Sequence, residues 1–187
     1  MTSNNTADMV VLVDAGDNTL GTMEKMEAHR KGVLHRAVSI LVFNNRKEWL
    51  LHRRAREKYH AGGLWTNACC THPFLEESYE DAACRRMMEE MGIEVEAKRL
   101  VRLFDFTYTA SFDNGLTEHE YDRVFAYITD TEPVPNPDEV MDWNYLPHET
   151  LDSDIRNHPD LYTPWFRIIY QKAMEHSDKI EGCFERG

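Results

Sequence analysis

Long apolar runs are missing from this sequence: no stretch approaches the roughly 18 consecutive apolar residues that a membrane-spanning helix requires. The opening residues, MTSNNTADMVV, also lack the basic start and the apolar stretch of a secretory signal peptide. We therefore expect a cytoplasmic protein with no membrane partner.

Basic residues are fewer than acidic residues. The chain has 21 Lys and Arg residues against 33 Asp and Glu residues, which gives a formal net charge of -12. Nonspecific nucleic-acid binding requires a basic surface, so nucleic acid is not an expected partner. A small anionic ligand is not excluded, because a local group of basic side chains can outweigh the overall sign of the charge.

Cysteine is also sparse, and its spacing excludes two common kinds of site. Only Cys69, Cys70, Cys84 and Cys183 occur, and none form a C-x-x-C pair, which argues against a zinc ribbon or a thioredoxin-like motif. A disulfide framework is not expected in a reducing compartment. Cys70 then has two interpretations: a small buried apolar side chain, or a reactive thiol activated by nearby positive charge. Spacing alone leaves both open.

The 187 residues show no internal repeat or interdomain linker and predict one domain. Apolar patterns predict strands at 9–14, 37–43, 48–52, 64–70 and 140–146, and a long hairpin over 95–129 that turns at the D-N-G of 113–115. Helices are predicted at 78–91, between a Ser78 cap and a Gly92 stop, and at 146–155 and 159–175. We expect an α/β (α+β) fold in which helices pack on both sides of a mixed or antiparallel sheet, with flexible tails at about 1–8 and 178–187.

Three carboxylates alternate along the second strand of the predicted hairpin. Glu118, Glu120 and Asp122 therefore face the same way. If that face is solvated, the row is an ordinary polar surface. If it is buried, the carboxylates repel one another and must be offset by a cation or by protonation.

Histidines are candidate companions of these carboxylates. His29 and His35 bracket the segment R-K-G-V-L, and His72 shares a face with Cys70 if that segment is extended. With Glu118 and Glu120 they make a set of imidazole and carboxylate ligands that suits a divalent ion such as Mn²⁺, Zn²⁺ or Mg²⁺. The alternative is a chance grouping, because the chain has nine histidines. The others are interpreted as surface or structural residues: His52, His60, His119, His148, His158 and His176.

Several basic residues stand out in so acidic a chain. Gathered together, they would hold a phosphate or diphosphate; scattered, they are surface charge. Two of them also precede glutamates by four residues on the predicted helix, so ordinary ion pairs explain them without a ligand. The residues are Lys25, Arg54, Lys58, Arg85 and Arg86.

Five stretches, taken in order, resemble the type I isopentenyl-diphosphate Δ-isomerases of the Nudix superfamily: M-E-K-M-E-A-H, A-G-G-L-W-T-N, T-N-A-C-C-T-H-P, E-D-A-A-C-R-R-M-M-E-E-M-G-I and T-E-H-E-Y. The resemblance covers roughly residues 10–170. It implies a Nudix-like domain and a metal-dependent, flavin-independent enzyme that interconverts isopentenyl diphosphate and dimethylallyl diphosphate for isoprenoid synthesis. The partner is then a small prenyl diphosphate, and the protein is a monomer or homodimer.

The Nudix box, G-x5-E-x7-R-E-U-x-E-E-x-G-U with U aliphatic, aligns with residues 71–93. Most positions agree, Glu90 among them. Thr71 stands in place of the glycine and Arg86 in place of a glutamate. Nudix hydrolases use helix carboxylates to bind several Mg²⁺ ions, so a cation at this position favours holding a diphosphate over cleaving it.

The resemblance assigns a role to each candidate residue. Isomerisation adds a proton at C4 and removes one at C2, so the site must supply an acid, exclude water and stabilise a carbocation. By the resemblance, Glu120 with Tyr108 delivers the proton, Cys70 accepts the other, and the Trp165 indole stabilises the cation. The metal ligands would be His29, His35, His72, Glu118 and Glu120, with Glu90 on a second, diphosphate-bridging Mg²⁺; the diphosphate contacts would be Lys25, Arg54, Lys58 and Arg86.

Two other functions stay open on the sequence. One is a Nudix pyrophosphohydrolase, which Arg86 and the Cys70–His72 pair argue against. The other is an inert metal-binding or scaffold protein on the same fold. The hydrolase would release phosphate, whereas the scaffold would take up metal without turnover.

Overall fold

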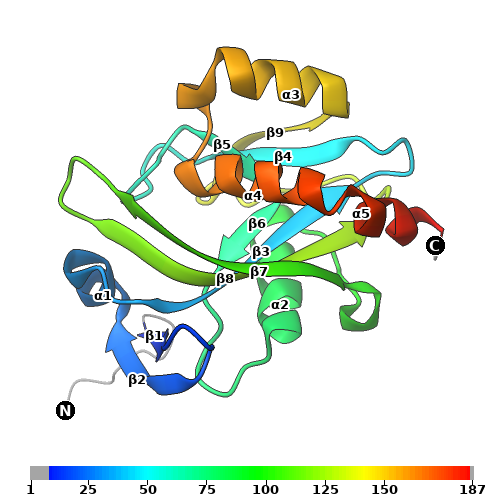
Figure 1. Ribbon diagram of the computed structural model, residues 1–187. Helices are drawn as coiled ribbons and strands as arrows, with labels where there is room; N and C mark the ends of the chain where they lie inside the picture. Colours follow the sequence, from blue (N-terminus) through cyan, green and yellow to red (C-terminus); the bar gives the residue numbers. More distant parts are fainter. Residues whose placement is uncertain (1–8, 186–187) are drawn as a thin grey trace.

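The computed structural model describes residues 9–185, shown in Figure 1. Within these residues nine strands form one sheet: β1 (Met9–Val13), β2 (Thr19–Glu24), β3 (His35–Phe43), β4 (Trp49–Arg54), β5 (Trp65–Asn67), β6 (Cys69–Thr71), β7 (Val101–Ser111), β8 (Thr117–Ile128) and β9 (Val140–Leu146). The helices are α1 (Lys25–Lys31), α2 (Tyr79–Met91), α3 (His148–Asn157), α4 (Pro164–Glu175) and α5 (Ser177–Phe184), with 3-10 turns at Ala97–Arg99 and Pro159–Leu161.

β3 is the centre of the sheet. It pairs in parallel with β8 along its whole length. The other edge of β3 is therefore left for β1, β6 and β4, which all pair with it antiparallel. The sheet is mixed, as the sequence predicts. β6 and β8 lie on opposite sides of β3, so side chains from both strands can reach the space above the same stretch of β3.

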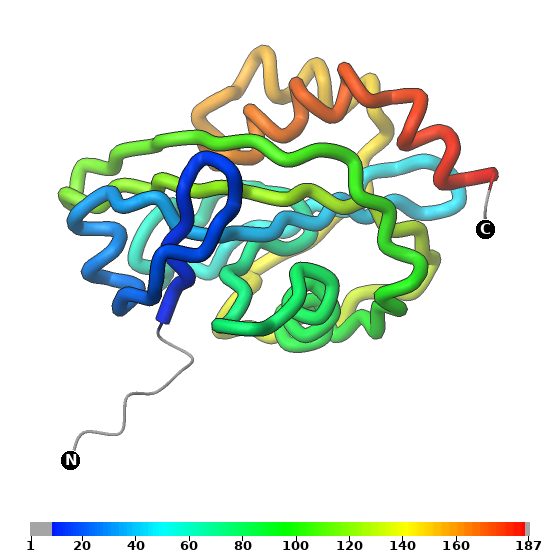
Figure 2. Tube along the Cα trace, turned by 60° about the horizontal axis from the view of Figure 1, so that its bottom comes forward, coloured from blue at the N-terminus to red at the C-terminus, as the bar shows by residue number. Residues whose placement is uncertain are grey.

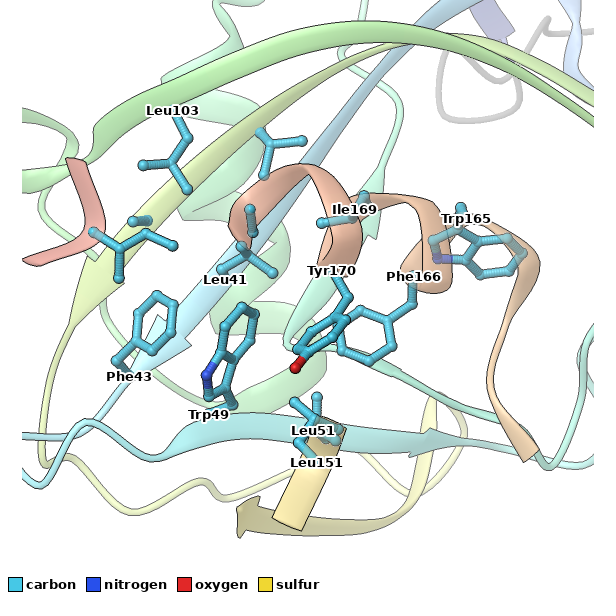
Figure 3. Packing of buried hydrophobic residues seen from close by; sticks show 14 of the residues in the cluster. Leu41, Phe43, Trp49, Leu51, Leu103, Leu151, Trp165, Phe166, Ile169 and Tyr170 are labelled. Carbon is cyan, nitrogen blue, oxygen red and sulfur yellow. The ribbon is translucent and has the colours of Figure 1, made fainter. Parts of the chain in front are cut away.

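Helices cover both faces of the sheet. In β3, Val38 and Val42 pack in the cluster that contains α2, whereas Leu41 and Phe43 pack in the cluster that contains α4 and α5. Burial on both sides explains why this strand is apolar at almost every position. Figure 2 shows α2 on one side of the strands and α4 and α5 on the other. Figure 3 shows the α4 cluster, with Trp165 at one end of the row of packed side chains.

The side of the sheet that α4 covers changes from apolar to acidic along β8. Val124 and Ala126 lie in its apolar cluster. Glu118, Glu120 and Asp122 continue the same row and are only 3%, 7% and 1% exposed. The row of carboxyl groups is thus buried, and its mutual repulsion has to be offset.

Glycine ends the helix that carries Arg86 and Glu90. Gly92 adopts a left-handed backbone conformation with φ 65°, and its N–H donates to the Met88 carbonyl at 3.1 Å. A Cβ at this position would lie 2.5 Å from the backbone oxygen of Val134. Both the backbone angle and the close approach therefore require glycine.

Replacing Gly92 with alanine is expected to lower the free energy of unfolding by about 2 to 4 kcal/mol, the sum of left-handed backbone strain and overpacking. Gly115→Ala is the matched control, because Gly115 also has a positive φ of 81° but nothing lies within 4 Å of its added Cβ. It should lose only the backbone part, about 1 to 2 kcal/mol. Urea unfolding of both variants measures the difference, and equal losses would contradict the role of the Val134 contact.

The N-terminal part of the chain holds more structure than the sequence predicts. The sequence predicts no strand between residues 14 and 37, but Thr19–Glu24 form β2 and pair with β1. β2 is mostly exposed and so lacks the apolar alternation of a buried strand. α1 has only seven residues and no usual cap; Glu24 takes that role, its carboxylate accepting from the N–H groups of Met26 and Glu27 at 2.8 Å.

Two further predictions need correction. The strand predicted over 64–70 breaks at Ala68, because β5 pairs with β4 whereas β6 pairs with β3. The flexible tail predicted over 178–187 is wrong for the part that forms α5, where Ile180 and Cys183 are buried against the α4 cluster. Residues 1–8, the other predicted tail, and 186–187 lie outside the described residues. No helix in residues 9–185 is long and apolar enough to cross a membrane.

Candidate active site and metal centre

A cavity of about 290 Å³ lies beside Glu118 and Glu120 of β8. Most of the residues that the sequence singles out line it: Lys25, Arg54, Lys58, Cys70, His72, Arg86, Glu90, Tyr108, Glu118, Glu120 and Trp165. His29 and His35 lie beside it, against the two glutamates of β8.

Five side chains bring metal-ligating atoms together. One such atom from each of His29, His35, His72, Glu118 and Glu120 lies within 4.8 Å of all the others. Nε2 of His29 is 2.9 Å from Oε2 of Glu118, and Nε2 of His72 is 2.9 Å from Oε1 of Glu120. Nε2 of His35 faces both carboxylates, at 3.8 Å from Glu118 and 3.7 Å from Glu120. The parallel register, which sets His35 opposite Glu120, creates this arrangement.

His35 shows that these residues fit a divalent ion. Its Nδ1 donates to the Val33 carbonyl at 2.8 Å, while its buried Nε2 has no hydrogen-bond partner. A buried polar atom without a partner is costly, and a cation between this nitrogen and the carboxylates would satisfy all of them. Burial lowers the pKa of His35, but Glu120, the Val33 carbonyl and Glu118 together outweigh burial and the pKa ends raised. The carboxylates that attract this proton would equally attract a metal ion.

Two other members of the cluster already have the protonation state of a ligand. Burial lowers the pKa of His72 to about 4, which leaves its imidazole neutral near pH 7. Burial raises the pKa of Glu118, but hydrogen bonds from His29 and His60 outweigh burial and hold the pKa well below its usual range. A neutral imidazole and an ionised carboxylate are the forms that bind metal.

His60 belongs to the site, which corrects its assignment as a surface or merely structural histidine. Its ring is 7% exposed, stacks on Tyr59 at 4.3 Å between centroids and lies 5.5 Å from the Trp165 ring. Its Nε2 contacts Oε1 of Glu118, the oxygen that does not face His29. The loop around it has no periodicity. The only signal in the sequence was its place two residues after Lys58.

Replacing His60 with alanine is expected to weaken divalent-metal binding about 10- to 100-fold, the usual effect of losing a group that orients a ligand. His60→Gln keeps an N–H donor for Glu118 and should retain most of the affinity. Calorimetric titration of the metal-free proteins with Mn²⁺ measures both. An unchanged affinity in the alanine variant would show that His60 does not orient Glu118.

Cys70 points from β6 into the space beside β3. Its Sγ is 3.2 Å from Ser39 Oγ and 3.1 Å from Asn67 Oδ1. The Asn67 amide nitrogen donates to the carbonyls of Ile40 and Cys69, so the amide oxygen faces the thiol and accepts its hydrogen. These contacts are neutral groups rather than the basic residues considered as activators. Burial raises the pKa of Cys70, so the sulfur carries its proton.

Glu120 and Tyr108 form an acidic pair on the opposite side of β3. They lie directly across from each other in the β7–β8 hairpin, and the phenol donates to Oε2 of Glu120 at 2.7 Å. Burial raises the pKa of Tyr108 well above its usual range. Burial and the charge of Glu118 raise the pKa of Glu120, but His35 and His72 outweigh them and the pKa ends lowered. The phenol is therefore the protonated member of this pair in the metal-free protein.

Aromatic rings and cations meet around the same cavity. Trp165 is 3% exposed, and its indole N–H donates to Thr66 Oγ1 at 3.0 Å, which fixes the ring. The Arg54 guanidinium lies 5.2 Å from the Trp165 ring centroid, and the Lys25 ammonium lies 5.0 Å from that of Tyr59. These contacts place positive charge beside aromatic rings that line the cavity.

Carboxylates accompany the other two basic residues. Lys58 pairs with Glu139. Arg86 pairs with Glu90, as the helix spacing predicts, with Glu89 at 2.8 Å and with Glu139 at 3.5 Å. Carboxylates therefore balance part of the charge of the cations that line the cavity.

Comparison with known proteins identifies the family. The NUDIX domain family matches residues 33–166. The Isopentenyl-diphosphate Delta-isomerase 2 of Aromatoleum aromaticum is 48% identical over 167 residues, which span 89% of this chain and 87% of that protein. The Isopentenyl-diphosphate Delta-isomerase of Pectobacterium atrosepticum is 44% identical over 167 residues, which span 89% of this chain and 92% of that protein. The chain belongs to the isopentenyl-diphosphate Delta-isomerase family.

Solved structures agree on the fold. The DR0079 protein of Deinococcus radiodurans has a TM-score of 0.67 at 22% identity and covers 80% of this chain and 90% of its own. The MutT protein of Methanosarcina mazei has a TM-score of 0.58 at 17% identity and covers 74% of this chain and 91% of its own. The isomerase family thus shares its architecture with other NUDIX proteins, and its distinguishing chemistry must come from individual residues.

The structure shows where the matching and the altered residues of the Nudix box lie. Glu77 and Arg85, which agree with the box, form a two-point ion pair at 2.8 Å that ties the loop after β6 to α2. Thr71 and Arg86, which depart from it, both line the cavity. Glu77 and Arg85 therefore hold the loop that carries His72, and the two altered residues line the cavity together with the matching residues Arg85, Glu89 and Glu90.

Proposed function

We propose that the protein interconverts isopentenyl diphosphate and dimethylallyl diphosphate, the activity in the names of its curated relatives. One observation carries the proposal: Cys70 and Glu120, from the two strands that flank β3, line one cavity. A shift of a double bond needs one group to give a proton and another to take one from the same substrate. Both groups line this cavity.

The proton transfers follow from the groups that face the cavity. Adding a proton at C4 creates a tertiary carbocation, and losing one from C2 restores the alkene. In our proposal the Glu120–Tyr108 pair and the Cys70 thiol are the two proton-transferring groups, and they exchange roles when the reaction reverses. In the metal-free protein the proton lies on sulfur and on the phenol. With Glu120 ionised, this state starts the reverse reaction, in which the thiol would give a proton to C2 and the Glu120 carboxylate would take one from C4; the forward reaction would start from a thiolate and a protonated Glu120.

The carbocation has to be stabilised without being trapped. The Trp165 ring offers a π face and has its only polar atom bonded to Thr66. Buried walls keep water, which would add to the cation, away from C3. A divalent ion, Mn²⁺, Mg²⁺ or Zn²⁺, held by the His29, His35, His72, Glu118 and Glu120 cluster would supply positive charge beside Glu120 and make its proton more acidic.

The basic residues that line the cavity are assigned to the diphosphate. Lys25, Arg54, Lys58 and Arg86 all line it and carry the charge that a diphosphate requires. Glu90 is 5% exposed beside Arg86 and would hold a Mg²⁺ that bridges the diphosphate. Anchoring the diphosphate here would position the alkene between the two proton-transferring groups.

One experiment separates this function from its alternatives. The protein is incubated with isopentenyl diphosphate and Mg²⁺ in D₂O and the products are followed by NMR. Deuterium-labelled dimethylallyl diphosphate is the expected product. Free phosphate or pyrophosphate would indicate a hydrolase, and an unchanged substrate would indicate an inert protein; either result would overturn the proposal.

Several finer features remain predictions. A monomer or homodimer, a cytoplasmic location and independence of flavin are expected of this function. So are a prenyl diphosphate as the ligand and the absence of nucleic-acid or membrane partners. Size-exclusion chromatography with light scattering determines the oligomeric state.

A further inference from the structure

The cations at the diphosphate end of the cavity are held by a carboxylate that the proposed function does not use. Glu139 pairs with Lys58 and lies 3.5 Å from Arg86. Its side chain is 21% exposed, as are those of Lys58 and Arg86. One carboxylate thus bridges two of the four residues assigned to the diphosphate, inside the cavity that would receive it.

Backbone hydrogen bonds hold the segment that carries Glu139. The Glu139 carbonyl accepts the N–H of Ala55 at 2.9 Å, in the loop that leads to Lys58. The N–H of Asn136 donates to the carbonyl of Glu90 at 2.9 Å, which ties the segment before Glu139 to α2. The backbone that carries Glu139 is therefore tied to both the Lys58 loop and α2.

A free diphosphate would meet two partly buried carboxylates, Glu90 and Glu139, among its cations. Repulsion between like charges is strong where solvent screening is weak. A divalent ion on the diphosphate reverses the interaction, because Mg²⁺ is commonly bound by one or two carboxylates together with substrate phosphates.

We propose that Glu139 is a specificity-determining residue that makes diphosphate binding conditional on Mg²⁺. The inference rests on the assignment of this end of the cavity to a diphosphate. Glu139 offsets part of the charge of Lys58 and Arg86 in the absence of ligand, repels a metal-free diphosphate, and accepts its Mg²⁺ complex. A purely structural ion pair predicts the opposite result for its removal, since a loosened cavity would bind every anion more weakly.

The test uses inorganic pyrophosphate as the probe, titrated calorimetrically into the wild-type protein and Glu139→Gln with and without Mg²⁺. We expect the wild type to bind pyrophosphate at least about tenfold more tightly with Mg²⁺. Glu139→Gln should bind metal-free pyrophosphate about tenfold more tightly than the wild type, a change that corresponds to one lost repulsion of about 1.4 kcal/mol. Glu89→Gln is the matched control: Glu89 also pairs with Arg86, but its side chain is 46% exposed, so little change is expected.

Three results would overturn the inference. One is a wild-type protein that binds pyrophosphate equally with and without Mg²⁺, a result that does not depend on how any variant folds. Another is a Glu139→Gln protein, folded by its thermal unfolding curve, that binds metal-free pyrophosphate no more tightly than the wild type. The third is an equal gain in Glu89→Gln. None of these measurements requires turnover, so failure of the isomerase assay and failure of this inference are distinguishable.

Discussion

Cys70→Ala is expected to lower kcat for isomerisation by about 10²- to 10⁴-fold, the range for loss of a proton-transferring group. KM should change little, because the Cys70 sulfur contacts Ser39 and Asn67 and is not one of the residues assigned to the diphosphate. Alanine removes the sulfur that Ser39 and Asn67 orient but leaves β6 paired with β3. Steady-state rates over a range of isopentenyl diphosphate concentrations separate kcat from KM.

The adjacent cysteine is the control. Cys69 is fully buried in the cluster that contains α2, on the other face of the strand from Cys70. Cys69→Ala removes only one sulfur from that core, so we expect a small loss of stability and most of the activity to remain. Two variants of equal activity would mean that the wrong group has been assigned to the proton transfer.

Glu120→Gln is the second large expected effect, because Glu120 is both an assigned metal ligand and half of the acidic pair. The amide keeps the shape of the side chain but can neither carry the proton nor bind a cation as strongly. We expect kcat to fall about 10²- to 10⁴-fold at every metal concentration. Activity measured against increasing Mn²⁺ tests this.

Glu118→Gln distinguishes the two roles of the pair. Glu118 faces His29 and His60, whereas Glu120 faces His72 and Tyr108. Loss of Glu118 should weaken metal binding but leave the proton-transferring pair intact. Its activity should therefore recover substantially at saturating Mn²⁺. If the Glu120 variant recovers to the same extent, Glu120 is a metal ligand and nothing more.

The row of carboxylates on β8 shows what can be predicted from the sequence alone. Alternation along β8 predicts that Glu118, Glu120 and Asp122 share a face, and they do. Whether that face is buried depends on the pairing of β8 with β3 and on the packing of α4, which are both distant in the chain. Local pattern therefore identified the candidate ligands, but only the fold decided that their charge must be offset.

The groups around Cys70 show what the sequence cannot provide. Ser39 reaches the sulfur through a β3–β6 pairing of only three residues. Asn67 reaches it because the chain breaks at Ala68 and changes its strand partner there. His60 reaches Glu118 from a loop without periodicity. None of these contacts leaves a local signature, because each depends on segments that meet only in the folded chain.

The fold by itself does not select the reaction. MutT and DR0079 share it at low identity. What favours an isomerase is the combination of a partly buried thiol, an acidic pair across β3 and an arginine at a Nudix-box glutamate position. A glutamate at position 86 would add a third carboxylate to those of Glu89 and Glu90 on α2, whereas Arg86 adds a positive charge there instead.

The most direct test of the central claim is a crystal structure of the protein with Mg²⁺ and isopentenyl diphosphate, which will contain one or both isomers. The account predicts the five-carbon chain between Cys70 Sγ and the Glu120–Tyr108 pair, each in van der Waals contact at about 3.5 to 4 Å. Trp165 should lie against the chain, and the diphosphate should lie among the basic residues. A chain bound outside this space, or with both groups on the same side of it, would contradict the account.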